Sequence, residues 1–228
     1  MKDPLRLVIF DVDGTLVDSQ SDIVAAMTAA FQDADQPVPN RATILSIVGL
    51  SLDQAMAKLA PNLTSATRMQ MVEGYKNAYI GLRTKTGVAE SSPLYPGARD
   101  VLELFRKQDN LLLGVATGKS RRGLDKLLEA HDLGDVFMTQ QVSDHHPSKP
   151  HPSMIKAALA ETGVEAKHAV MIGDTSYDMD MARAAGIGAI GVSWGYHNVS
   201  LLTSADRIVS TFPELPHALE ESWKVMAS

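Results

Sequence analysis

The chain has 228 residues, of which 45% are hydrophobic and 21% are charged, with a formal net charge of -6. These proportions are typical of one large globular domain, or of a domain with an insertion, and they exclude a wholly disordered chain. The acidic balance gives no general basic face for nucleic acid. There is no cysteine, which excludes disulfides, thiolate metal sites and a cysteine nucleophile.

The sequence also argues against a membrane protein and a secreted protein. No apolar run reaches the ~18–20 residues of a membrane-spanning helix. The first residues, Met1 to Arg6, lead directly into a strand-like run and lack the pattern of a signal peptide. We therefore expect a cytoplasmic protein with neither a membrane nor a nucleic acid as its partner.

Short apolar runs that stop at acidic residues or glycine predict buried strands. The first covers residues 5–10, and the later ones cover 111–116, 136–142, 169–172, 189–192 and, more weakly, 207–210. Helical periodicity lies between them at 98–107, 123–129, 153–162 and 179–185. This alternation predicts the α/β class, with a doubly wound, Rossmann-like parallel sheet that has helices on both faces.

Residues 21–90 break the alternation, because they show helical patterns and no convincing strand. Ser51 and Gln54 have the spacing of a capping box that would open a helix over 52–59. We therefore predict a smaller all-helical domain, residues 19–90, inserted after the first strand. The core domain would consist of residues 1–18 and 91–228.

Two aspartates follow the first strand, in Asp11-Val12-Asp13-Gly14-Thr15-Leu16. In an open parallel sheet, ligands bind beyond the carboxyl ends of the strands, so both carboxylates are placed where chemistry occurs. A plain Asp-Gly turn would explain Asp13 and Gly14. It would leave Asp11 unexplained, because a charge at the end of a buried strand is costly when it is unpaired.

A second acidic pair, Asp174 and Asp178, follows the strand at 169–172. Helix capping would account for one of these carboxylates but poorly for both. Acidic residues at two strand ends of one sheet indicate a hard cation, and Mg²⁺ prefers a few carboxylates together with water and phosphate oxygens.

Two further features complete the predicted site. Thr117-Gly118-Lys119 ends another strand and offers a hydroxyl and backbone N–H groups for phosphate oxygens. Lys149 lies in a proline-rich loop, which restricts its backbone. Each feature alone is weak evidence, since a lysine in a polar loop is usually solvated and a threonine after a strand is usually a cap.

Taken in order, these stretches resemble the four motifs of the haloacid dehalogenase (HAD) superfamily, and the resemblance spans residues 7 to about 195. The helical insertion is similar to the α-helical cap of that superfamily's first subclass. Other stretches resemble phosphoglycolate phosphatase-like members: Leu16-Val17-Asp18-Ser19 with Asp22-Ile23, Tyr95-Pro96-Gly97, and Val192-Ser193-Trp194-Gly195-Tyr196.

The resemblance implies a Mg²⁺-dependent phosphatase acting on a small phosphorylated metabolite, phosphoglycolate-like or a sugar phosphate, through an aspartyl-phosphate. It makes Asp11 the nucleophile and Asp13 the general acid and base. The implied Mg²⁺ ligands are the Asp11 carboxylate, the Asp13 backbone carbonyl and Asp174, with Asp178 in an outer shell. The implied groups that hold the phosphoryl oxygens are Gly14, Thr15, Thr117, Gly118 and Lys149.

Two departures leave the substrate open. Gly118 stands where many relatives have an asparagine, although its backbone amide could still donate. The segment 47–52 lacks the Val-Gly-Asn-Gly pattern frequent in phosphoglycolate phosphatases. Arg41, Lys58 and Arg83 could contact a substrate from the predicted cap, but each fits a solvated helix residue better.

Alternatives remain within and outside this reaction. A phosphomutase of the β-phosphoglucomutase type is disfavoured because Ser19 to Met27 lacks the cap-hinge histidine of those relatives. A dehalogenase would need neither a second carboxylate nor a metal. A non-catalytic binding or regulatory module on the same fold is a third possibility. The loop with His145, His146 and His151 is a weak metal candidate, because adjacent side chains in extended chain point in opposite directions. The sequence allows a monomer or a homodimer.

Overall fold

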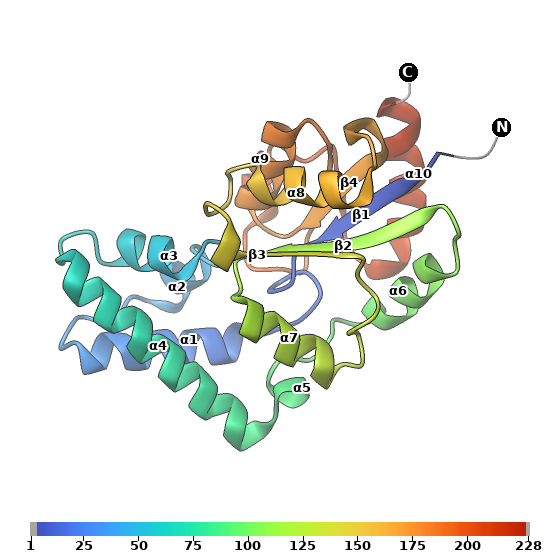
Figure 1. Cartoon of the computed structure of the whole chain (residues 1–228). Coiled ribbons are helices and arrows are strands. Elements are labelled where there is room, and N and C mark those ends of the chain that lie inside the picture. The colour runs from blue at the N-terminus through green and yellow to red at the C-terminus, as the bar shows by residue number, and fades with distance from the viewer. Residues whose placement is uncertain (1–3, 227–228) are drawn as a thin grey trace.

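A computed structural model of the chain describes residues 4–226 (Figure 1). Within them lies a six-stranded sheet in which all paired strands are parallel, in the order β3-β2-β1-β4-β5-β6. The strands are β1 (Arg6–Phe10), β2 (Leu111–Thr117), β3 (Thr139–Val142), β4 (Ala169–Gly173), β5 (Gly188–Val192) and β6 (Arg207–Val209). The predicted fold class is confirmed.

The strand order reverses at β1, and this reversal positions the site. The chain places β2 and β3 on one side of β1 and then crosses to β4 on the other side. In the sheet register, Phe10 at the end of β1 lies beside Val115 of β2 and Ile172 of β4. The residues that follow these three strands therefore meet at a topological switch point, where ligands bind in folds of this kind.

Helices cover both faces of the sheet, as the alternating pattern predicted. One face is covered by α6 (Ala98–Arg106), α7 (Arg121–Ala130) and α10 (Leu215–Met226), and the other by α8 (Ser153–Thr162) and α9 (Ser176–Ala185). In β1, Val8 and Phe10 belong to the first apolar cluster and Leu7 and Ile9 to the second. This explains why β1 is apolar throughout, since both of its faces are buried.

Short 3₁₀ turns join several elements: η1 (Ser143–His145), η2 (Ala166–His168), η3 (Val199–Leu201) and η4 (Phe212–Glu214). The predicted strand over 136–142 begins only at Thr139. Val136 and Phe137 are buried in the core, but the Val136 N–H closes a turn onto the Leu133 carbonyl. Val136 and Phe137 are apolar because they are buried, and this apolar character made the predicted strand longer than β3.

The helical insertion after β1 consists of α1 (Gln20–Asp33), α2 (Arg41–Leu45), α3 (Leu52–Leu59), α4 (Ser65–Thr86) and α5 (Val88–Ser91). It has its own apolar cluster, which includes Met27, Met56 and Met71. Figure 1 shows α1 to α4 beside the sheet, on the side where β2 ends. The domain boundaries at 18/19 and 90/91 stay a prediction. The outer bounds of the predicted core domain, residues 1 and 228, lie outside the described residues. Residues 1–3 of the segment Met1 to Arg6, on which the signal-peptide argument rests, lie outside them as well.

The helix Leu52–Leu59 forms as predicted, but its predicted capping box does not. Ser51 is the N-cap residue without a side-chain cap bond, and its N–H donates instead to Ser148 Oγ of the core at 2.9 Å. A tertiary contact has replaced the local one. Across residues 4–226, no helix has the length and apolar character needed to cross a membrane.

Candidate active site

Lys149 and two carboxylates form the buried centre of the site. The Lys149 Nζ donates to Asp11 Oδ1 at 2.7 Å and to Asp178 Oδ1 at 2.6 Å. Asp11 follows β1, Asp178 lies in the first turn of α9, and Lys149 comes from the loop before α8. Asp11 is 1% exposed and Lys149 2%. The sequence therefore identified three residues that tertiary folding brings into direct contact.

Asp178 both caps a helix and holds the lysine. Its Oδ2 accepts from the Thr175 N–H at 3.1 Å and from the Thr175 hydroxyl at 2.7 Å, which completes a capping box at the start of α9. Its other oxygen accepts from Lys149. Helix capping and a contact with Lys149 are thus not alternatives for this residue, because a different carboxylate oxygen makes each of them.

Asp174 is fixed by groups from two loops. Thr15 Oγ1 donates to its Oδ1 at 3.0 Å, and the Tyr196 N–H donates to its Oδ2 at 2.7 Å. A Cβ on Gly14 or on Gly195 would lie 2.2 or 2.1 Å from Asp174 side-chain atoms, so both glycines are needed for this close approach.

The phosphate-binding role that the resemblance implies for Gly14 and Thr15 stays a prediction, and in the structure both residues have other contacts. Their N–H groups donate within the loop, to Val17 and Val12 carbonyls, and the Thr15 hydroxyl is used by Asp174. Neither residue lines the cavity described below. Both serve to position Asp174.

The carboxylates suit a divalent cation. One oxygen from each of Asp11, Asp174 and Asp178 lies within 4.8 Å of the others, and Asp11 Oδ2 is buried without a hydrogen-bond partner. Burial, opposed by Lys149, raises the pKa of Asp11 to about 7. Burial and the charge of Asp11 raise the pKa of Asp174 well above its ordinary value. A cation beside these oxygens would stabilise their ionised forms.

Lys149 stays charged in this environment. Burial alone would lower its pKa, but the neighbouring Asp11 and Asp178 carboxylates outweigh burial and hold the pKa above its ordinary value. The cluster of Asp11, Asp174 and Asp178 thus contains three carboxylates, and Lys149 pairs with two of them. The cluster retains negative charge that a divalent cation would neutralise.

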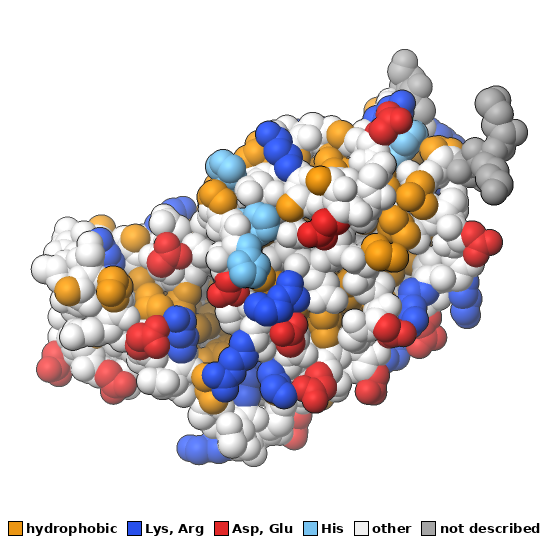
Figure 2. Space-filling view, in the orientation of Figure 1, with side chains coloured by type: hydrophobic (Ala, Val, Ile, Leu, Met, Phe, Trp, Pro, Cys, Tyr) orange, Lys and Arg blue, Asp and Glu red, His pale blue; other side chains and the backbone are white. Residues whose placement is uncertain are grey.

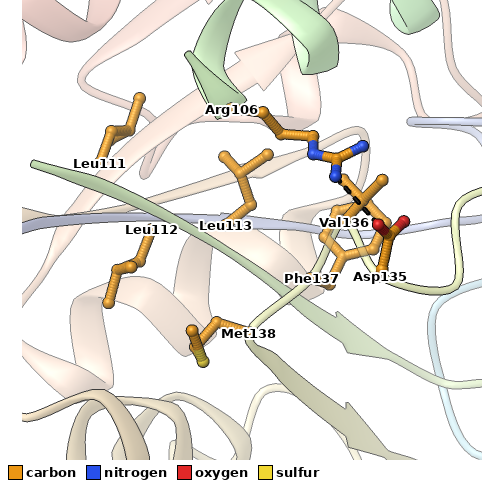
Figure 3. A pocket seen from close by; sticks show the side chains of 8 residues that line it. All are labelled: Arg106, Leu111, Leu112, Leu113, Asp135, Val136, Phe137 and Met138. Atoms are coloured by element: carbon orange, nitrogen blue, oxygen red, sulfur yellow. Dashed lines mark hydrogen bonds and ion pairs between the residues drawn. The ribbon is translucent and has the colours of Figure 1, made fainter. Parts of the chain in front are cut away.

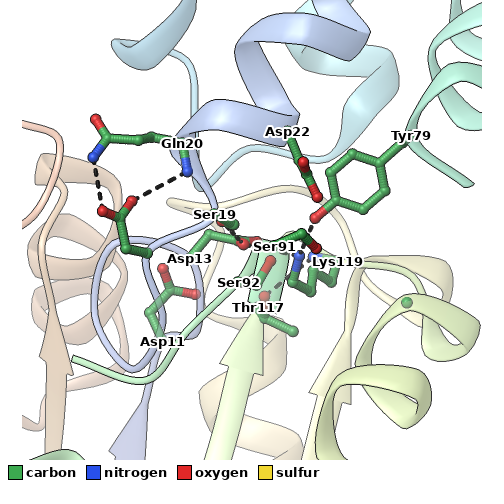
Figure 4. Close-up of polar contacts among 12 residues, drawn as sticks. Asp11, Asp13, Ser19, Gln20, Asp22, Tyr79, Ser91, Ser92, Thr117 and Lys119 are labelled. Carbon is green, nitrogen blue, oxygen red and sulfur yellow. Dashed lines mark hydrogen bonds and ion pairs between the residues drawn. The ribbon is translucent and has the colours of Figure 1, made fainter. Parts of the chain in front are cut away.

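Asp13 lies beside Ser19 and Lys119, near the helical insertion (Figure 4). Its Oδ1 accepts a short hydrogen bond from Ser19 Oγ and forms an ion pair with Lys119 Nζ at 2.8 Å. Lys119 Nζ in turn donates to the Tyr79 hydroxyl of α4 at 3.2 Å. Sequence reasoning missed this role of Lys119, although the residue stands beside the predicted Thr117 and Gly118.

Thr117 and Gly118 lie where the sequence placed them, at the end of β2 beside Asp11 and Asp13. The structure also explains why residue 118 is a glycine. A Cβ there would lie 2.5 Å from the Leu50 carbonyl oxygen and 2.8 Å from that of Gly49. A larger residue would push the insertion's 47–52 segment away from the site.

The insertion touches the core at further points. The Ser46 carbonyl accepts from the Tyr177 hydroxyl at 3.0 Å and contacts His197 Nε2 at 3.0 Å. Since His197 Nδ1 accepts from the Ser176 N–H, Nε2 carries the proton and donates. Together with the bond from Ser51 to Ser148, these contacts hold the insertion against the core.

A cavity of about 730 Å³ lies between core and insertion. Asp11, Asp13, Thr117 and Gly118 line its core end, and its other walls come from α4, residues 47–55, two residues of α1, and the core segments 119–126 and 143–144. Figure 2 shows hydrophobic side chains in a hollow over the insertion, beside lysine and arginine side chains. Of the predicted catalytic residues, Asp11, Asp13 and Thr117 line this cavity, and Lys149 lies behind Asp11, to which it donates.

A smaller cavity of about 340 Å³ lies elsewhere, between the start of β2 and residues 135–138 (Figure 3). Its polar groups are mainly Arg106 and Asp135, whose ion pair of 3.0 Å is largely exposed. It contains none of the predicted site residues.

The three bases predicted as solvated differ in the structure. Arg41 contacts the Gln20 side chain, and Lys58 Nζ donates to the Tyr177 hydroxyl at 3.1 Å. Arg83, by contrast, is only 8% exposed and lines the cavity, so the expectation of a solvated residue is wrong there.

The histidine loop has a structural role at His146. Its two ring nitrogens contact Ser153 Oγ at 2.8 Å and Gln141 Oε1 at 2.9 Å. Among residues 4–226, the only group placed to hold a metal is the Asp11, Asp174 and Asp178 cluster. The weak metal prediction for His145, His146 and His151 is thus not supported in the described chain.

Comparison with known proteins agrees with the motifs. The family model "Haloacid dehalogenase-like hydrolase" matches residues 8–192. "Probable phosphatase IndB" of Dickeya dadantii (strain 3937) is 36% identical over 227 residues, which cover 97% of this chain and 96% of that protein. A phosphoglycolate phosphatase of Haemophilus influenzae (strain 86-028NP) is 27% identical and covers 94% of this chain and 98% of its own.

A solved structure of a haloacid dehalogenase-like family hydrolase from Streptococcus pneumoniae superposes with a TM-score of 0.80 at 27% identity, over 94% of this chain and 98% of that one. The family model covers most of the chain, and the buried Asp11, Lys149 and Asp174 occupy the ordered motifs from which the resemblance was first stated. The chain therefore belongs to the haloacid dehalogenase-like hydrolases.

Proposed function

We propose that this protein is a Mg²⁺-dependent phosphatase that hydrolyses a small phosphorylated metabolite through an aspartyl-phosphate. The observation that carries the proposal is how the two carboxylate oxygens of Asp11 are contacted. One of its oxygens is held by Lys149 at 2.7 Å, and the other is buried without a partner next to Asp174 and the cavity. A carboxylate held by a lysine through one oxygen, with its other oxygen unpartnered, is placed to act as a nucleophile toward a ligand.

The reaction has two steps. An Asp11 oxygen attacks phosphorus, the bond to the leaving oxygen breaks, and Asp13 gives that oxygen a proton. Asp13 then removes a proton from water as the water attacks the phosphoryl group. The Asp11–phosphorus bond breaks, and inorganic phosphate and the original carboxylate result. Asp13 suits both steps, because it faces the cavity beside the insertion while Asp11 lies deeper.

Charge neutralisation is assigned to several groups. The Asp11 carboxylate, the Asp13 backbone carbonyl and Asp174 would hold Mg²⁺, which supplies positive charge beside the phosphoryl oxygens when it is bound. Thr117, Gly118 and Lys149 would bind those oxygens directly. Asp178 would keep Lys149 in place through its 2.6 Å bond.

Residues 19–90 are proposed to act as a cap over this site. The contacts of Ser46 and Ser51 with the core support a closed position, in which bulk water is excluded during the first step. Relatives named phosphoglycolate phosphatase support a phosphorylated small acid, and a sugar phosphate is the second choice. The cytoplasmic location and the choice between monomer and homodimer stay predictions.

Phosphate release from a panel of phosphorylated metabolites, with 2-phosphoglycolate included, tests the proposal. We expect turnover with Mg²⁺, loss of turnover with EDTA and recovery when Mg²⁺ is restored. Isomerisation of a sugar phosphate without phosphate release would instead show a phosphomutase. Folded protein that binds a phosphorylated ligand but never releases phosphate would show a non-catalytic module.

A further inference from the structure

The cavity has a second end that the reaction does not use. Beyond Asp13 its walls include polar groups, among them Lys76, Arg122 and Lys126, and a set of apolar side chains of the insertion: Ile23, Met27, Ile47, Val48, Leu50 and Val72. Cavities of roughly 300–1,000 Å³ accommodate drug-sized ligands, and this one has about 730 Å³. A two-carbon leaving group would leave most of this apolar surface uncovered.

The cavity has this volume although the insertion already lies against the core. Ser51 N–H already donates to Ser148 Oγ at 2.9 Å, and Gly118 already lies against the carbonyls of Gly49 and Leu50. The insertion cannot move much closer to the core without a clash at Gly118. The space must therefore be filled by the substrate itself, or by water.

Helix α4 presents a stacked row to this space. Tyr75, Tyr79 and Arg83 are four residues apart, so they lie on one face of the helix. The two tyrosine rings stack at 5.7 Å with an interplanar angle of 15°, and the Arg83 guanidinium lies 4.5 Å from the Tyr79 ring centroid. Each member restricts the next, so the guanidinium is preorganised.

Ser92 and Asp22, neither of which lines the cavity, hold Arg83 in place, and its Nε–H is left without a hydrogen-bond acceptor. Its Nη2 donates to Ser92 Oγ at 2.6 Å, and Asp22 Oδ2 lies 3.7 Å from its Nε, too far for a hydrogen bond. The Nε is buried without a hydrogen-bond partner, and Arg83, unlike Asp22 and Ser92, lines the cavity. A buried donor in this state is completed by an acceptor on a ligand.

Lys119 provides a second cation near the same ring. Its Nζ lies 5.4 Å from the Tyr79 centroid and 2.8 Å from Asp13 Oδ1, and its side chain is 8% exposed. Because Asp13 must reach the leaving oxygen, Lys119 adjoins the first carbon atoms of the leaving group. Each cation has one carboxylate beside it, Asp13 for Lys119 and Asp22 for Arg83, and both cations also border the cavity, where an anionic group of a ligand can reach them.

We propose that the preferred substrate is a phosphate monoester whose leaving group joins a carboxylate to a bulky apolar part. The carboxylate binds Lys119 and Arg83, and the apolar part fills the space along Ile23, Met27 and Val72. This inference rests on the proposed phosphatase function and deepens it. It implies that phosphoglycolate itself, which lacks the apolar part, is a poor substrate.

Four esters form a matched test: 2-phosphoglycolate, 2-hydroxyethyl phosphate, 3-phenyllactate 2-phosphate and 3-phenylpropane-1,2-diol 2-phosphate. The second and fourth replace the carboxylate of the first and third by a neutral CH₂OH group. We expect the wild-type kcat/KM for phenyllactate phosphate to exceed that for phosphoglycolate by roughly 10- to 100-fold, as burial of a phenyl ring predicts. We expect each acid to exceed its neutral analogue by about 10-fold or more.

Arg83→Gln should lower the ratio of kcat/KM for acid over neutral ester by about 10-fold. Lys85→Gln, an exposed change in the same helix turn, should leave the ratio unchanged. Equal rates for acids and neutral esters, or a preference for phosphoglycolate over the larger acid, would overturn the inference. The wild-type comparison decides this even if the Arg83 variant does not fold.

The two proposals fail in different ways. If p-nitrophenyl phosphate and acetyl phosphate are hydrolysed while the four esters show no such pattern, the phosphatase function stands and the substrate inference falls. If folded protein with Mg²⁺ hydrolyses neither the four esters nor p-nitrophenyl phosphate nor acetyl phosphate, the phosphatase function itself falls.

Discussion

The two ends of the cavity are built differently. At the core end, nearly every polar group has a partner: Lys149 binds two carboxylates, Asp174 accepts two hydrogen bonds, and the buried residues come from loops that follow neighbouring strands. At the insertion end apolar walls alternate with polar groups, which include Tyr79, Lys119 and Arg83 and also Lys76, Arg122 and Asp144. In the proposed function, the core end would determine which bond is broken and the insertion end which molecule is accepted.

The largest expected effect is at the nucleophile. Asp11→Asn should lower kcat by at least about 10⁴-fold for every substrate, because no other carboxylate can replace the attacking oxygen. Phosphate release under saturating substrate measures this, with the exposed Asp109→Asn as the control. A loss that varied strongly between substrates would contradict the separation between the two ends of the cavity.

Lys149→Met should affect both activity and stability. It leaves two carboxylates, Asp11 and Asp178, buried without their cation, and breaking a buried pair costs about 3–5 kcal/mol of the free energy of unfolding. Urea unfolding in cation-free buffer measures this loss. Lys167→Met removes an exposed pair with Glu165 and should cost no more than about 1 kcal/mol. Equal losses in both variants would show that the Lys149 pairs do not stabilise the core.

Gly118→Ala tests how the two ends are joined. The added Cβ would lie 2.5 Å from the Leu50 carbonyl oxygen, so the segment 47–52 must move. We expect kcat/KM to fall by about 10-fold, since displacement near reacting groups is costly. Gly134→Ala has nothing within 4 Å of its added Cβ and is the control. Unchanged activity in Gly118→Ala would mean that the contact at Gly118 is dispensable.

The smallest expected effect is a pH dependence of cation binding. The pKa of Asp11 is raised from 3.8 to about 7 in the folded protein, so between these values the folded state holds more protons than the unfolded state. The free energy of unfolding therefore falls as pH rises through this window, and the full cost is present above pH 7. A bound cation replaces the proton and offsets that cost.

Addition of Mg²⁺ should then raise Tm by several degrees more at pH 8 than at pH 6. Thermal unfolding with and without the cation measures this difference. In Asp11→Asn the Mg²⁺ effect should be small at both pH values. A Tm increase that is independent of pH in the wild type would exclude Asp11 as the group that exchanges its proton for the cation.

The sequence by itself determined the fold class and the chemistry. Apolar strands alternating with helices specify a doubly wound sheet, and such a sheet brings the carboxyl ends of adjacent strands together. The positions of Asp11, Thr117 and Asp174 therefore follow from local pattern alone. The contacts of Lys149 with Asp11 and Asp178 could be expected for a related reason, because the resemblance to an ordered set of motifs implies one common site for these residues.

Only the tertiary structure decided how the insertion meets the core. The ion pair between Lys119 and Asp13, the burial of Arg83 and the need for glycine at 118 all depend on two separately packed units docking against each other. A helical periodicity cannot distinguish a solvated arginine from one that lines a cavity, because both occupy a polar face of the helix. Docking, which involves residues far apart in the chain, makes that distinction.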